Sequence, residues 1–248
     1  MVVGNWKLHK TPTETREFLT GFRACLPKSR RCDVVFCVPT VCIPAAVRAV
    51  RESRIAIGGG NCSAYACGPY TGEVSALMLA DAGCRFVITG HPERRAIGET
   101  DDDVNAKLHA ILNAGLSPIL CCGETQAQRE LGVTEPWITM QLCAALRGVP
   151  SDALRRIVVA YTPNWAVESG GAAAPELAQE GCAHVRAVLR KLYGARLARS
   201  VVVLCGGMDE HSAEQLLAQP DIDGGLIGSA SLEAERFLQI VEAANQAL

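Results

Sequence analysis

Residues 156–194 read RIVVAYTPNWAVESGGAAAPELAQEGCAHVRAVLRKLYG, and they contain a complete strand–loop–helix unit. The run at 156–161 is short and almost continuously apolar, which is typical of a strand covered on both faces. From residue 174 onward apolar residues recur at spacings of three and four, and Gly194 follows as a helix-ending cap. The stretch therefore predicts one β-strand followed by one α-helix.

The same alternation fills the rest of the chain. Further short apolar runs lie at residues 2–4, 33–38, 54–58, 86–90, 117–122, 201–205 and 224–228. Further helix-like stretches lie at residues 11–26, 124–132, 212–219 and 233–248. About eight strands and eight helices follow each other without a linker or charge run between two domains. Repeated units of this kind build either a closed eight-stranded barrel or a doubly wound open sheet.

Two observations favour the barrel. The first strand is followed by GNWKLHK, residues 4–10, which lacks the glycine fingerprint usual after the first strand of a dinucleotide-binding open sheet. The count of eight strands and the length of 248 residues also fit the barrel. We therefore expect an α/β fold, a single (β/α)8 TIM barrel that forms one domain over residues 1–248.

Composition narrows the class of protein. Hydrophobic residues make up 49% and charged residues 20%, with a net charge of −2, so we expect a soluble globular protein that binds neither nucleic acid nor membrane. No signal-peptide core or membrane span is visible. Most of the twelve cysteines lie inside apolar runs, so we interpret them as buried, reduced thiols. Their spacing does not suggest a zinc site, and a reducing cytoplasm is the expected location.

Polar residues and glycines gather where the predicted strands end. Chemistry in such barrels takes place at the carboxyl ends of the strands, so these residues are the candidate site. They are Asn5 and Lys7, Gly60 and Asn61, His91 and Glu93, Cys121 and Glu124, Thr162, Gly206 and Gly207, and Gly228 and Ser229. Lys7 suits an anionic ligand or a developing oxyanion, although a lone lysine is more often a solvated surface charge.

His91 precedes Pro92, a residue that favours the first turn of a helix. An imidazole at a helix amino terminus tends to stay neutral, and a neutral imidazole can still donate a hydrogen bond to a carbonyl. The alternative is a histidine that only caps or packs. Glu93 could pair with Lys7 or be an ordinary first-turn carboxylate.

Glycines end the seventh and eighth predicted strands. They lie in CGG at 205–207 and GGLIGSAS at 224–231, where barrels often bind phosphate on backbone N–H groups. Either pair alone could be a tight turn, but both together favour an anion site.

Eight ordered segments now resemble the triosephosphate isomerase family along the whole chain. They are GNWK (4–7), NCSA (61–64), GPYTGEVS (68–75), GHPERR (90–95), CCGETQAQRELG (121–132), AYTPNWAV (160–167), CGG (205–207) and DIDGGLIGSASL (221–232). The resemblance implies an enzyme of glycolysis and gluconeogenesis that interconverts dihydroxyacetone phosphate and glyceraldehyde 3-phosphate through an enediolate. It implies no metal and no cofactor.

The resemblance also implies roles for residues. Asn5 and Lys7 correspond to the polar and cationic substrate contacts, His91 to the electrophilic imidazole, and Glu93 to a buried carboxylate. Residues Thr71, Gly72 and Glu73 correspond to the tip of a loop that reaches into the neighbouring subunit, so a homodimer is implied.

The chain departs from the family pattern at several site positions. The family reads Ala-Tyr-Glu-Pro-Val-Trp-Ala-Ile-Gly-Thr-Gly where this chain reads AYTPNWAVESG, residues 160–170. The departures are Thr162 for the catalytic glutamate, Asn164 for an apolar hinge residue, Glu168 for a loop-tip glycine that meets the phosphate, Met208 for a phosphate-contacting serine, Ser229 for a glycine, Gly60 for a glutamine and Pro92 for a serine.

These departures remove one half of the expected chemistry. Thr162 is far too weak a base near neutral pH, whereas Asn5, Lys7, His91 and Glu93 keep the electrophilic half. Glu168 adds negative charge beside the predicted phosphate and lies too far along the loop to replace the base. Cys121 is also a poor replacement, because an apolar setting should raise its thiol pKa. We expect a family member with impaired or altered isomerase activity. The alternatives are an inactive phosphoester-binding or interaction protein, an isomerase of a related small keto-phosphate, and a scaffold engineered to lack its base.

Overall fold

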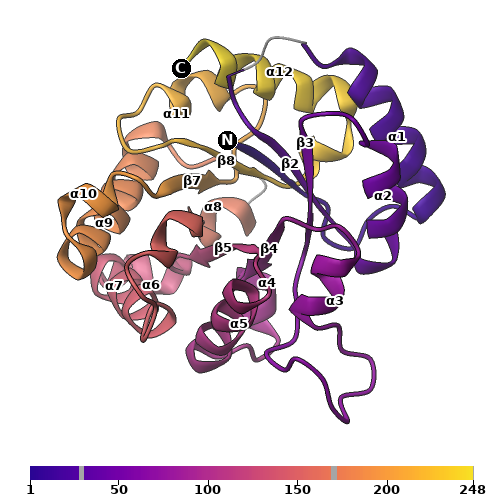
Figure 1. The fold of residues 1–248 in the computed structure, drawn as a ribbon. Helices are drawn as coiled ribbons and strands as arrows, with labels where there is room; N and C mark the ends of the chain where they lie inside the picture. The colour runs from indigo at the N-terminus through magenta and orange to yellow at the C-terminus, as the bar shows by residue number, and fades with distance from the viewer. Residues whose placement is uncertain (28–30, 169–171, 248) are drawn as a thin grey trace.

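The structure is a computed structural model that describes residues 1–27, 31–168 and 172–247, without the side chains of Val167 and Glu168. Its strands form one closed parallel barrel in chain order, surrounded by helices (Figure 1). The strands are β1 (Val2–Asn5), β2 (Val34–Val38), β3 (Ile55–Gly59), β4 (Phe86–Thr89), β5 (Ser117–Cys122), β6 (Val158–Tyr161), β7 (Val202–Gly206) and β8 (Gly224–Ile227). The predicted (β/α)8 barrel is therefore confirmed.

The outer layer contains more helices than the sequence suggested. Within the described residues there are twelve α-helices instead of about eight, because several connections carry a short extra helix. The helices are α1 (Pro12–Cys25), α2 (Ile43–Ala49), α3 (Ala76–Asp81), α4 (Pro92–Ala96), α5 (Asp101–Asn113), α6 (Gln126–Glu130), α7 (Thr134–Ala145), α8 (Asn164–Glu168), α9 (Pro175–Tyr193), α10 (Ala195–Ala198), α11 (Ala213–Leu217) and α12 (Ala234–Gln246). Three short 3₁₀ segments are η1 (Thr40–Cys42), η2 (Ala153–Arg156) and η3 (Ser229–Leu232).

The strands are continuously apolar because each is buried on both faces. In β2, Val35 and Cys37 pack inside the barrel, whereas Val34 and Phe36 pack against the helices. Successive side chains of a strand point to opposite faces, so a strand between two apolar layers has no polar face. Pairing of Val2 with Gly225 joins β1 to β8 and closes the barrel.

An aromatic cluster joins the two ends of the chain on the outside of the barrel. Trp6, Phe18, Phe22, Phe36 and Phe237 come from the segment after β1, from α1, from β2 and from α12, and neighbouring ring centroids lie 4.9 to 6.0 Å apart. Mostly edge-on and tilted contacts of this kind add specific stabilisation to the area that they bury.

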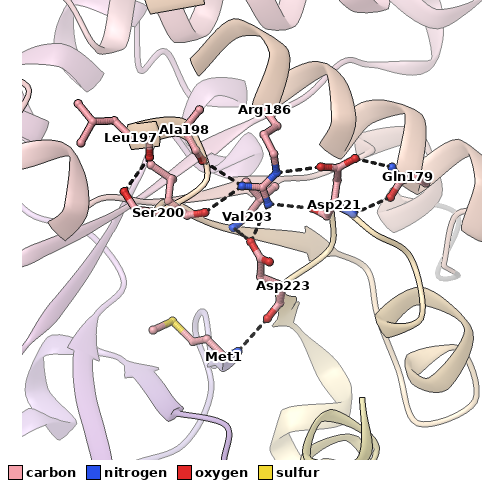
Figure 2. A network of polar contacts seen from close by, with 10 residues as sticks. Met1, Gln179, Arg186, Leu197, Ala198, Ser200, Val203, Asp221 and Asp223 are labelled. Atoms are coloured by element: carbon pink, nitrogen blue, oxygen red, sulfur yellow. Dashed lines mark hydrogen bonds and ion pairs between the residues drawn. The ribbon is translucent and has the colours of Figure 1, made fainter. Parts of the chain in front are cut away.

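The amino-terminal ends of the last strands are joined by a polar network (Figure 2). Arg186 of α9 donates to Asp221 and Asp223 just before β8, and Asp223 also accepts from the backbone N–H of Val203 in β7. The terminal ammonium group of Met1 donates to the Asp223 carbonyl at 2.9 Å. The network holds α9, β7, β8 and the amino terminus together at the end of the barrel opposite the candidate site.

Most of the cysteines are buried thiols, as their apolar surroundings in the sequence predicted. Nine of the twelve cysteines are buried, and all twelve are free thiols, whereas Cys25, Cys67 and Cys143 are exposed. No helix within the described ranges combines the length and apolar character that crossing a membrane requires.

Candidate active site

The end of β1 holds Asn5 and Lys7 in fixed positions. Asn5 is 6% exposed, and its Oδ1 accepts the N–H of Lys7 at 3.1 Å. Lys7 has a φ of 51°, which costs a residue with a side chain about 1 kcal/mol or more. Between them, buried Trp6 donates from its indole to the carbonyl of Ser231 at 3.1 Å. These bonds hold the strained turn and join it to the segment after β8.

His91 lies two residues after the end of β4 and caps the amino terminus of α4, where the sequence predicted a helix start. Its Nδ1 accepts the N–H of Glu93 at 3.3 Å. Burial lowers the pKa of His91 to about 4, although the nearby carboxylate of Glu93 opposes the shift. The ring is therefore neutral near pH 7, and because Nδ1 accepts, its proton is on Nε2, where it can be donated to a ligand.

Glu93 pairs with Lys7, which was one of the two roles open to it. The carboxylate Oε1 lies 2.5 Å from the Lys7 ammonium nitrogen, and the two side chains are 55% and 30% exposed. The expectation that Glu93 is buried is therefore wrong in this chain. The buried carboxylate of this region belongs to Glu99, which accepts the N–H of Gly90 and pairs with Lys107.

Thr162 follows β6 and is 3% exposed. Its N–H donates to the carbonyl of Cys122 at 2.8 Å, but within the described residues its hydroxyl has no hydrogen-bond partner. Gly123 makes room for it, because a Cβ at Gly123 would lie 1.9 Å from the Thr162 carbonyl oxygen. Cys121 is buried inside the barrel, and burial raises its pKa, so it is an inert thiol.

The segment after Thr162 forms the short helix α8. The indole of Trp165 donates to Glu124, a fully buried carboxylate that also accepts from the hydroxyl of Tyr161 and pairs with Arg129. Glu168 ends α8, and its side chain, like residues 169–171, lies outside the described part of the structure.

Turns after β7 and β8 form the opposite wall. Gly207 has a φ of 79°, in the region that favours glycine, and Met208 beside it is buried. Gly228 leads into η3, which begins at Ser229, and the carbonyl of Gly228 accepts from the hydroxyl of Ser231 at 2.6 Å.

One pocket brings most of these residues together. Its volume is about 190 Å3, and it lies at the carboxyl ends of the strands. Eight of the ten residues expected to catalyse or bind substrate line it, namely Asn5, Lys7, His91, Thr162, Gly207, Met208, Gly228 and Ser229. Glu93 stands at its edge through the ion pair with Lys7.

Two charged residues in this pocket were missed by the sequence interpretation. Asp209 and Arg236 line the same end as Gly207 and Ser229. Burial raises the pKa of Asp209, but hydrogen bonds from Ser212 and from backbone N–H groups outweigh this effect and keep that pKa below its ordinary value. Arg236 pairs with Glu210 at 2.6 Å. Asp209 lies two residues after Gly207 in the turn after β7, and this position at a strand end is a signal that could have identified it.

A second polar group behind His91 was also missed. The Lys107 ammonium group pairs with Glu99 and donates to the side chain of Asn61 at 2.9 Å. Arg95 donates to the carbonyl of Gly90 and pairs with Asp101. These contacts fix the turn that carries His91.

The three residues of the expected dimer loop lie apart from the pocket. Thr71, Gly72 and Glu73 are exposed, in the long connection between β3 and α3 that projects from the barrel (Figure 1). Within this loop the rings of Tyr65 and Tyr70 stack with centroids 3.9 Å apart.

The geometry fits a small anionic ligand that carries a carbonyl group. Lys7 supplies positive charge, and neutral His91 supplies an N–H donor. The turns at Gly207 and Gly228 can supply backbone N–H groups. Among the described residues lining this pocket, Asp209 carries the only carboxylate.

Comparison with known proteins agrees with this geometry over the whole chain. The family model described as triosephosphate isomerase matches residues 1–244. The triosephosphate isomerase of Chloroflexus aurantiacus is 43% identical over 243 residues, which cover 97% of each chain. Those of Lacticaseibacillus casei and Lactobacillus helveticus are 41% and 39% identical, over 96% and 97% of this chain and 96% of each relative.

Proposed function

Because the chain belongs to the triosephosphate isomerase family, we propose that its pocket binds dihydroxyacetone phosphate and glyceraldehyde 3-phosphate and interconverts them slowly. The observation that carries this proposal is the pocket itself, which places Lys7, His91 and Thr162 at one end of the barrel. The electrophilic side chains are in place, and the position of the general base is occupied by a hydroxyl.

Binding of the phosphate is supported by the turns after β7 and β8. Gly207, Gly228 and Ser229 line one end of the pocket and can present backbone N–H groups to an anion. Lys7 stands nearby with its ammonium group held by Glu93. A phosphate at this end leaves the carbonyl carbon of a triose between His91 and Thr162.

Activation of the carbonyl is supported by the state of His91. A neutral ring that donates from Nε2 can stabilise negative charge as it develops on a carbonyl oxygen. The Lys7 ammonium group adds electrostatic stabilisation in the same pocket. Both groups lower the energy of an enediolate.

Removal of the proton is the weak step. A positioned general base contributes about 10²–10⁴-fold, and a threonine hydroxyl is not a base at neutral pH. Asp209 does not compensate, because its low pKa makes it a weak base and its oxygen Oδ1 already accepts from Ser212 and from the N–H of His211. Slow turnover therefore follows from the composition of the pocket.

The assay that tests this proposal measures interconversion of the two triose phosphates for the unmodified protein, Thr162→Glu and Thr162→Gln. We expect Thr162→Glu to raise kcat/KM by about 10²–10⁴-fold. Thr162→Gln introduces a side chain with the shape of glutamate but without the charge, so its kcat/KM should stay near that of the unmodified protein. Efficient turnover by the unmodified protein would contradict the argument about the missing base.

A second candidate function rests on the same threonine. If Thr162→Glu stays inactive but a phosphoglycolate probe still binds, the protein is a phosphoester-binding member of the family without isomerase activity. Failure of the probe to bind as well would leave an interaction role. Activity on another small keto-phosphate, but on neither triose phosphate, would identify an isomerase of a related substrate.

We also propose a homodimer in a reducing compartment such as the cytoplasm. The dimer is supported by the projecting loop with Thr71, Gly72 and Glu73 and by exposed apolar side chains, among them Leu8, Val41 and Ile97. The reducing compartment is supported by the twelve free thiols. Light scattering that returned the mass of a single chain would contradict the dimer.

A further inference from the structure

A second cavity opens beside the candidate active site. Its volume is about 420 Å3, more than twice the about 190 Å3 of the first pocket. The two share Lys7, His91 and Thr162, so they meet at these side chains. Beyond them the second cavity extends between the start of α4, the turn after β5 and helix α7.

The composition of this cavity differs from that of the first pocket. Pro92 and Ala96 of α4 and the ring of Trp137 of α7 supply apolar and aromatic wall. Gln141 is anchored, because its side-chain oxygen accepts the N–H of Gly123 at 2.9 Å. An enclosure with aromatic and apolar walls and a few placed polar groups is the usual composition of a small-molecule site.

Two side chains that line this cavity each carry a buried polar atom without a hydrogen-bond partner in the described part of the chain. Thr162 Oγ1 and Asn164 Oδ1 both belong to its lining, and these side chains are 3% and 8% exposed. Neither atom has a hydrogen-bond partner within the described residues. A buried polar atom without a partner is destabilising, and both atoms are covered by protein here, so a side-chain rotation that brings either atom to a ligand in the cavity is favoured. A hydroxyl or an amide, which can both donate and accept, satisfies them.

Thr162 lies where the two cavities meet. It lines both, and its side chain is shorter than the glutamate that the family pattern has there. A longer carboxylate at this position would stand in the shared opening and would place a charge beside the apolar wall. The substitution that removes the base therefore also joins the two cavities.

We propose that this site accepts a phosphate monoester longer than a triose phosphate, whose other end passes Thr162 and enters the second cavity. Such a ligand carries a hydroxyl or amide group next to Thr162 and Asn164 and an apolar, preferably aromatic, group against Trp137. The inference rests on the proposed function for its phosphate end only.

The test compares two probes that differ in the arm alone. The N-methylamide and the N-benzylamide of phosphoglycolic acid have the same phosphate and the same amide, and only the second has an aromatic ring. Calorimetric titration of the unmodified protein should give a Kd for the benzylamide roughly tenfold or more below that of the methylamide. Equal affinities of the two probes would overturn the inference and leave phosphate binding intact. That result would mean that water, or the loop of a second copy, fills the cavity instead of the ligand.

Three variants localise the effect. Trp137→Ala should lose most of the benzyl preference and leave the affinity for the methylamide unchanged, which also reports correct folding. Asn164→Leu, close to an isostere, should weaken both amides without removing the preference for the ring. Thr162→Glu should abolish the preference by closing the passage. If neither probe binds to the unmodified protein, phosphate binding fails and both proposals are overturned; retention of the preference in Trp137→Ala would overturn the assignment of this cavity.

Discussion

Replacing Arg186 should destabilise the barrel more than any comparable change in a surface ion pair. Its guanidinium donates five hydrogen bonds, two to the carboxylates of Asp221 and Asp223 and three to backbone carbonyls (Figure 2). Two of those carbonyls, of Ala198 and Val201, belong to buried residues. Arg186→Met keeps most of the side-chain volume and removes all five donors.

The size of the effect follows from what is left without a partner. A buried carbonyl that loses its donor costs about 1–3 kcal/mol, although the Ala198 carbonyl keeps a long hydrogen bond from the N–H of Val201 at 3.4 Å. The two carboxylates contribute less, because Asp221 and Asp223 are 25% and 42% exposed and keep hydrogen bonds from Gln179 and Val203. We expect a loss of about 3 kcal/mol in the free energy of unfolding, somewhat less than for breaking a fully buried pair. Arg186→Lys keeps the charge but not the planar fork and should lose about half as much.

Urea unfolding at a fixed protein concentration measures this loss, which should lower the transition midpoint by about 1 M. The matched control is Arg147→Met, which breaks the pair with Asp102, where the side chains are 66% and 80% exposed. The control should lose less than about 0.5 kcal/mol. If the two methionine variants unfold at the same urea concentration, the network is not a source of stability and the reasoning is wrong.

Two further predictions concern the site itself. The folded chain lowers the pKa of His91 to about 4, whereas the unfolded chain has a value near 6.5, so the unfolded state binds this proton first as the pH falls. The contribution of His91 to the free energy of unfolding is therefore complete above pH about 6.5 and is lost towards pH about 4. Between pH 7 and pH 5 the unmodified protein should lose about 2 kcal/mol more of that free energy than His91→Asn, as measured by urea unfolding. Parallel pH profiles of the two proteins would contradict a neutral, buried ring. Gly123→Ala would force a Cβ against the Thr162 carbonyl, 1.9 Å away, and should destabilise the protein by about 2 kcal/mol or more, whereas Gly21→Ala, in the exposed middle of α1 with open space around it, should stabilise by roughly 0.5–1 kcal/mol. Thermal unfolding compares the two alanine variants directly, and similar melting temperatures would refute the steric argument.

The strands were predictable because each carries its own signal. A run such as 118–122 is apolar throughout, and that pattern depends only on burial of both faces, which every strand of a closed barrel shares. The helices were less predictable. Helices α8 and α10 have five and four residues, too few for an apolar period to repeat.

The candidate site divides in the same way. Residues at strand ends, such as Asn5, His91 and Gly207, could be placed together because parallel strands of one barrel all end on one side. Arg236 was missed because it reaches the pocket from α12, a helix that lies beyond the last strand. Asp209 was missed although it lies close to the end of β7. The burial expected for Glu93 was wrong, because its exposure depends on how α4 packs and not on the residues beside it.

By itself the amino-acid sequence determined the barrel, its order of strands and the replacement of a carboxylate by Thr162. These are local facts, since apolar runs, turn glycines and residue identity are complete within a few positions. Only the tertiary structure decided the burial that keeps His91 neutral, the pairing of Lys7 with Glu93, and the cavity that joins the site at Thr162. Each of these depends on distances between atoms from different strands and helices, and such distances exist only after the barrel has closed.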